Sequence, residues 1–130
     1  MKSLNPATVA KPGPGYAQGV AVGGTIYVAG QVAVDVAGAI VGQGDIVAQT
    51  RQTLTNVANI LSAGNATLAD IVSTTVYLRD LGDYPSFART WTEVFGEHRP
   101  ARATVKAELV RPDLLVEIQV IAVPPDGTRA

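Results

Sequence analysis

Two β-prone runs separated by a pair of glycines lie in the first part of the chain. Residues 16–22 (YAQGVAV) and 25–34 (TIYVAGQVAV) are rich in β-branched and aromatic residues, and Gly23 and Gly24 lie between them. Two strands joined by a two-residue glycine turn are typical of a β-hairpin, so this segment predicts one. The glycine-rich residues 35–44 then predict a loop with room for a short edge strand.

The spacing of apolar residues predicts two helices. The first helix begins after Asp45, a favoured N-cap residue, and ends at Gly64, a residue suited to a helix end. The second helix is predicted from Asp83 to Gly96, with Pro85 in its first turn. Its apolar face consists of Tyr84, Phe87, Trp91, Val94 and Phe95.

Three further runs have the composition of buried strands. They are residues 71–78 (IVSTTVYL), 101–109 (ARATVKAEL) and 114–123 (LLVEIQVIAV). The order of elements predicts an α+β fold in which one mixed β-sheet is covered on one face by two helices. The runs at 25–34 and 114–123 are apolar on both sides of the strand, yet two helices cover only one face. We therefore expect association with other copies through the second face.

Length and composition are those of a single globular domain. The chain has 130 residues, of which 47% are hydrophobic and 16% charged, so we expect one domain over residues 1–130. The first fifteen residues contain three prolines and two glycines, which indicates an extended lead-in over 1–15. Residues 124–130 are expected to form a frayed tail.

Charge and residue content exclude several classes of partner and site. The formal net charge is −1, so neither nucleic acid nor anionic lipid is an expected partner. The chain has no cysteine and one histidine, His98, which stands in a polar loop without a companion at ligand spacing. We therefore expect a solvated loop histidine and no metal site. The N-terminal residues contain no long apolar run, which favours a cytoplasmic location without a membrane segment.

Two charged residues interrupt otherwise apolar strands. Arg102 opens the run at 101–109, and Glu117 lies in the run at 114–123, where burial of a carboxylate is costly unless it is paired. One explanation is a structural ion pair between Arg102 and Glu117 across neighbouring strands. The other is a functional role for both residues, and the strand patterns favour neither explanation.

Several short motifs carry a resemblance over most of the chain. They are Tyr16 after Gly13-Pro14-Gly15, YVAGQVAVD at 27–35, the long segment at 49–84, RPARATV at 99–105 and LVEIQVIAV at 115–123. Together, in this order and from about Tyr16 to Val123, they resemble the reactive intermediate deaminase family, also called the YjgF family.

The resemblance implies a fold, an assembly and a reaction. Members of the family have a chorismate-mutase-like α+β fold and form homotrimers whose sheets face the centre, with active sites in clefts between subunits. Similar members hydrolyse reactive 2-enamines and 2-imines, such as 2-aminoacrylate and 2-iminopropanoate, to 2-oxo acids and ammonia without a cofactor. The partners implied are thus a small 2-imino or 2-oxo acid and two further copies of the chain.

The resemblance also implies roles for five residues. Arg102 matches the arginine that binds the substrate carboxylate, and a guanidinium suits this role because it binds a carboxylate bidentately. Glu117 matches the glutamate that orients the attacking water. Tyr16 and Gly30 match positions that line the cleft, and the backbone N–H of Thr104 is placed to donate to the same carboxylate.

Three positions depart from the family pattern. Family deaminases often carry Ser, Asn and Cys where this chain has Ala29, Ala88 and Thr104. The departures leave two functions open, a 2-imino acid deaminase and a trimeric protein that binds small carboxylates with little turnover. The family has also been linked to ribonuclease activity, which the isoelectric point of about 5.7 and the scattered basic residues disfavour here.

Overall fold

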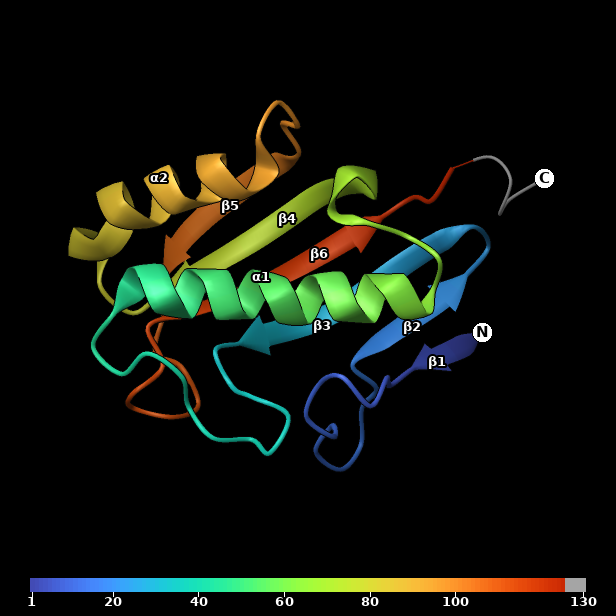
Figure 1. Ribbon diagram of the computed structural model, residues 1–130, viewed down its shortest axis with the longest axis horizontal. Coiled ribbons are helices and arrows are strands. Elements are labelled where there is room, and N and C mark those ends of the chain that lie inside the picture. Colours follow the sequence, from blue (N-terminus) through green and yellow to red (C-terminus); the bar gives the residue numbers. More distant parts are fainter. Residues whose placement is uncertain (126–130) are drawn as a thin grey trace.

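Two helices lie on one face of a six-stranded sheet in the computed structural model, which describes residues 1–125 (Figure 1). The strands are β1 (Lys2–Leu4), β2 (Gly19–Val22), β3 (Thr25–Val32), β4 (Ile71–Leu78), β5 (Ala101–Lys106) and β6 (Val116–Ala122), and the helices are α1 (Ile46–Ala63) and α2 (Tyr84–Phe95). Short 3₁₀ turns at Leu68–Asp70 and Leu81–Asp83 lead into β4 and α2. The predicted α+β architecture is confirmed.

The sheet is mixed, as predicted, and has the strand order β1-β2-β3-β6-β4-β5. Strands β4 and β5 pair in parallel, and every other neighbouring pair is antiparallel. The helix α2 supplies the crossover that two parallel strands require, since it connects β4 to β5. Strand β5 lies at the edge of the sheet, where β4 is its one neighbour, and it lies beneath α2 (Figure 1).

Both helices begin and end where their sequences indicate. The Asp45 carboxylate accepts a 3.0 Å hydrogen bond from the Ala48 amide at the start of α1, and Gly64 is the C-cap. At α2 the first turn contains Pro85, and the helix ends at Gly96, whose φ of 62° favours glycine. The two predicted helices are confirmed.

Most strands are shorter than their apolar runs suggest. The predicted strand at 71–78 matches β4, whereas β3, β5 and β6 end earlier or begin later than the predicted 25–34, 101–109 and 114–123. For β5 the reason is the end of its partner, because the Ala107 amide binds the carbonyl of Leu78, the last residue of β4. An edge strand without a partner has nothing further to pair with.

The predicted lead-in at 1–15 is wrong for its first residues. Strand β1 pairs with β2, and the side chains of Leu4 and Val9 are buried in the core. The prolines begin only at position 6, so they do not prevent three N-terminal residues from adding an edge strand. In the tail predicted at 124–130, the residues from 126 onward lie outside the described part of the chain.

The core lies between the helices and one face of the sheet, and the other face is open. The four even-numbered residues of β6 from Val116 to Ala122 point into the core and are almost completely buried. The opposite face carries two rows of side chains across the central strands. These rows are Tyr27–Ile121–Ser73–Ala101 and Val32–Glu117–Tyr77–Val105. Tyr27 and Val105 are 47% and 44% exposed, so this face presents apolar surface to its surroundings.

Within residues 1–125, the longest helix is not apolar enough to cross a lipid bilayer.

Candidate active site

Arg102 lies against the aromatic face of α2. It pairs with Thr74 of β4, whose side chain is buried under the helices, so Arg102 points to the helix-covered face. The Arg102 Cζ atom lies 5.7, 5.4 and 5.1 Å from the ring centroids of Tyr84, Phe87 and Trp91. Its Nη2 donates a 2.8 Å hydrogen bond to the Tyr84 hydroxyl. The cation is thus half-buried and held by aromatic rings.

The guanidinium of Arg102 retains unused donors. Within residues 1–125 its only hydrogen bond is the one to Tyr84, and no carboxylate forms an ion pair with it. A guanidinium has five N–H donors, so most of them are available to a ligand. Arg102 also borders a pocket of about 300 Å³. The other residues that line this pocket are Trp91, Thr92, Phe95, His98, Arg99 and Pro100. An anionic ligand suits this environment.

Thr104 follows two residues after Arg102 on the same strand. It pairs with Val76, which is fully buried under the helices, so Thr104 and Arg102 share one face of β5. The side chain of Thr104 is half-buried at the edge of the sheet. The structure therefore brings the two residues together, as their spacing in a strand requires.

Glu117 lies on the open face of the sheet. It stands between Val32 of β3 and Tyr77 of β4 in the row that ends at Val105. Burial among these neighbours raises the pKa of Glu117 above its ordinary value of 4.5. No cation within residues 1–125 forms an ion pair with this carboxylate. A carboxylate with a raised pKa is better suited to accept a proton from water near neutral pH.

Gly30 lies next to Glu117, and Tyr16 lines a pocket together with Gly30. A Cβ atom on Gly30 would lie 2.8 Å from the Glu117 Cδ and still closer to its Oε2, so only glycine leaves room for this carboxylate. Gly30 and Tyr16 line one pocket of about 240 Å³, into which the cationic residues Lys11 and Arg111 also face. The structure thus brings Gly30 together with Glu117, and Tyr16 together with Gly30.

These two groups of residues do not meet within one chain. Glu117 and Arg102 point to opposite faces of the sheet, and β4 lies between their strands, which places them at least two strand spacings, about 9–10 Å, apart. The explanation of Arg102 and Glu117 as a structural cross-strand ion pair is therefore wrong. The sheet itself separates the two charges.

His98 is not the solvated loop residue that the sequence suggests. Its Nε2 lies 2.7 Å from the carbonyl oxygen of Ile71, and its ring is half-buried 6.1 Å from the ring of Phe95. Because a carbonyl only accepts, this nitrogen donates its proton and fixes the loop after α2 to the start of β4. The local sequence could not show this contact, since Ile71 is 27 residues away. No group of three or more possible metal ligands occurs in the described part of the chain.

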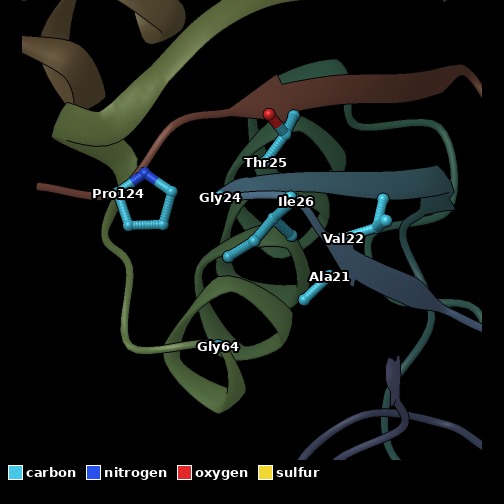
Figure 2. A pocket seen from close by; sticks show the side chains of 8 residues that line it. Ala21, Val22, Gly24, Thr25, Ile26, Gly64 and Pro124 are labelled. Atoms are coloured by element: carbon cyan, nitrogen blue, oxygen red, sulfur yellow. The ribbon is translucent and has the colours of Figure 1, made fainter. Parts of the chain in front are cut away.

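A separate pocket without charged side chains lies at the turn between β2 and β3 (Figure 2). It has a volume of about 210 Å³. Its lining consists of Ala21, Val22, Gly23, Gly24, Thr25, Ile26, Gly64 and Pro124. Among these residues no side chain is charged, and none is a predicted site residue.

The sequence does not reveal the partners of Arg102. Its apolar spacing predicts Tyr84, Phe87 and Trp91 only as the apolar face of a helix. Their helical spacing places them on one stripe, but the sequence does not reveal that the edge strand carrying Arg102 runs beneath that stripe.

Comparison with known proteins decides the family. The sequence model described as Endoribonuclease L-PSP matches residues 7–124. The chain belongs to this family, which is the YjgF or reactive intermediate deaminase family. The resemblance noted in the sequence is thereby confirmed.

The protein is similar to other members of the YjgF family along almost its whole length. It is 39% identical to a RutC family protein of Pyrococcus abyssi over 112 residues, covering 86% of this chain and 88% of the relative. It is 40% identical to the 2-iminobutanoate/2-iminopropanoate deaminase of Salmonella typhimurium over 111 residues, covering 83% and 86%. The crystal structure of the YjgF gene product of E. coli superimposes with a TM-score of 0.87 at 35% identity, covering 95% and 98%.

Proposed function

We propose that the protein hydrolyses small 2-imino acids and their 2-enamine tautomers to 2-oxo acids and ammonia. The observation that carries the proposal is the Arg102 guanidinium, which is held by aromatic rings, has no carboxylate partner within residues 1–125 and borders a pocket. A fixed guanidinium with free donors suits the α-carboxylate of such a substrate. The similarity to a relative named 2-iminobutanoate/2-iminopropanoate deaminase supports the same reaction.

The reaction requires little beyond orientation. Water adds to the carbon of a protonated C=N bond and gives up a proton, which leaves a carbinolamine. Glu117 passes this proton to the amine nitrogen, and the C–N bond then breaks to release ammonia while the hydroxyl loses its proton and the C=O bond of the 2-oxo acid forms. Arg102 binds the carboxylate, and Glu117 orients the water and accepts its proton. Such positioning and proton transfer lower the barrier because the protonated imine is already electrophilic. Tyr16 and Gly30 line the side of the cleft next to Glu117, and the Thr104 amide donates to the substrate carboxylate.

The proposed site is completed between copies of the chain. Arg102 with Thr104 and Glu117 with Tyr16 and Gly30 form two half-sites on opposite faces of one sheet. A homotrimer whose open sheet faces meet at the centre would bring the edge strand β5 of one copy to the Glu117 side of the next. It would also cover the apolar open face. Light scattering should then give a mass three times the 13.5 kDa of one chain. A stable monomer at micromolar concentration would contradict this assembly.

Turnover and binding test the two half-sites separately. Ammonia release is measured with imines generated in situ by an amino acid oxidase, and binding is measured by calorimetry with pyruvate. Arg102→Ala should abolish both, and Arg102→Lys should restore neither fully, because a point charge cannot provide two parallel donors. Glu117→Gln should reduce turnover by about 10²–10⁴-fold and leave pyruvate binding intact.

A second candidate function is the binding of small carboxylates with little turnover. It is favoured by the presence of Ala29, Ala88 and Thr104 where related deaminases often have polar or reactive side chains. Pyruvate binding by the wild-type protein, together with ammonia release no faster than the uncatalysed rate, would favour this function over the deaminase.

A further inference from the structure

The Arg102 side chain is ordered by one helix before any ligand arrives. Tyr84, Phe87 and Trp91 follow one another along one stripe of α2, with adjacent ring centroids 6.3 and 5.6 Å apart. The Arg102 Cζ lies within 6 Å of all three centroids, which is the range of a cation–π contact. The rings therefore restrict where the guanidinium lies.

Tyr84 adds a directional contact to these rings. Its hydroxyl accepts the 2.8 Å hydrogen bond from Nη2, the only hydrogen bond of the Arg102 guanidinium within residues 1–125. Ring contacts fix the position of a guanidinium, whereas a hydrogen bond also fixes the rotation of its plane. Bidentate binding of a carboxylate depends on that plane, because two parallel N–H donors must face the two oxygens.

From this geometry we infer that Tyr84 is a positioning residue for Arg102. Its hydroxyl orients the guanidinium for bidentate binding of a 2-oxo or 2-imino carboxylate. The inference rests on the proposed function in that Arg102 is taken as the carboxylate-binding residue. It adds a residue of α2 that touches no reacting atom and acts through Arg102.

The expected effect is on affinity and not on the chemical step. Ordering a long, flexible side chain on binding weakens affinity, and prior ordering avoids that loss. Removal of the hydroxyl in Tyr84→Phe should therefore weaken pyruvate binding and raise KM by about two- to tenfold. The value of kcat should stay close to wild type, because the carboxylate is bound equally in the ground state and in the transition state. A purely structural role would instead lower the active fraction, and with it kcat, and leave KM unchanged.

A control variant tests whether the loss of any exposed hydroxyl changes binding. Ser62→Ala removes the hydroxyl of an exposed residue of α1, and this hydroxyl makes no hydrogen bond in the described part of the chain. We expect Ser62→Ala to keep the wild-type KM and pyruvate affinity.

A second measurement does not depend on ligand or turnover. Nuclear magnetic resonance of the Arg102 Nε–Hε group reports how freely the guanidinium rotates. It should show hindered rotation in the wild-type protein and in Ser62→Ala, and faster rotation in Tyr84→Phe. Unchanged rotation in Tyr84→Phe would overturn the inference even if the proposed deaminase activity holds. Faster rotation in Tyr84→Phe would support it even if the wild-type protein releases no ammonia.

Discussion

At the scale of single residues, the protonation of Glu117 is coupled to folding. Burial raises its pKa above 4.5, so the folded chain holds this proton more tightly than the unfolded chain. As the pH rises through the interval between the unfolded and folded pKa values, the unfolded chain loses its proton first. The free energy of unfolding therefore falls over this interval and stays reduced above it. The wild-type protein thus carries a penalty at neutral pH that is absent at low pH.

Glu117→Gln should remove that dependence on pH. We expect the variant to gain free energy of unfolding relative to wild type near pH 7, and the difference to shrink as the pH falls through the raised pKa of Glu117 toward about pH 4. Urea unfolding at fixed protein concentration over this range measures the difference. Glu108→Gln, which removes a charge from an exposed residue, provides the baseline for a change of net charge. A difference between wild type and Glu117→Gln that does not vary with pH would contradict the coupling.

Gly30 determines where the Glu117 carboxylate lies. In Gly30→Ala the new Cβ would lie 2.8 Å from the Glu117 Cδ, and the end of a flexible side chain would move to relieve the overlap. We therefore expect a melting temperature close to wild type, with a loss of turnover of about 10²-fold from the displaced carboxylate. In the Glu117→Gln background the same substitution should cost little further turnover. Wild-type turnover in Gly30→Ala would show that the position of this carboxylate is not critical.

At the scale of elements, the two helices differ in how they begin. The Asp45 carboxylate caps α1 through the Ala48 amide, whereas Asp83 makes no capping hydrogen bond to α2. Desolvation, and then the neighbouring Asp80, raise the pKa of Asp83, so its charge is not favoured there. We expect Asp45→Ala to lower the free energy of unfolding by about 0.5–2 kcal/mol. Asp83→Ala should stay within about 0.5 kcal/mol of wild type. Chemical denaturation that gives equal losses would contradict the assignment of Asp45 as the cap.

Local sequence patterns predict a helix or strand well when the residues of that element alone determine its structure. The helix after Asp45 and the strand at 71–78 follow from a cap, a helical stripe and a β-branched run. Local patterns fail to predict the existence or the ends of a strand when these depend on a neighbouring strand that is distant in the sequence. Strand β1 exists because β2 offers its edge, and β5 ends because β4 ends at Leu78. The same holds for the site. Arg102 and Glu117 stand out as charges in apolar strands, but only the strand order reveals that they point to opposite faces.

At the scale of the whole molecule, association with another copy would both cover the open sheet face and complete the proposed site. Glu117 is the one charged residue in the row from Val32 to Val105, on a face whose apolar side chains are not covered by any part of residues 1–125. Arg102 stands on the edge strand, where a neighbouring molecule can reach it. In the proposed homotrimer, a second copy that covers the open face would therefore also supply the missing half of each proposed site. Assembly and activity should be lost together.

Mixed trimers test this directly, because Arg102→Ala and Glu117→Gln remove different half-sites. If each site takes Arg102 from one copy and Glu117 from its neighbour, a site is intact when the first copy is Glu117→Gln and the second is Arg102→Ala. Random assembly of equal amounts of the two inactive variants should then restore about one quarter of wild-type ammonia release. Co-expression with two different affinity tags shows that mixed trimers have formed. As a control, trimers that combine Arg102→Ala with the double variant Arg102→Ala/Glu117→Gln contain no intact Arg102 and should stay inactive. No recovery of ammonia release in verified mixed trimers of the two single variants would contradict a site that takes Arg102 from one copy and Glu117 from its neighbour.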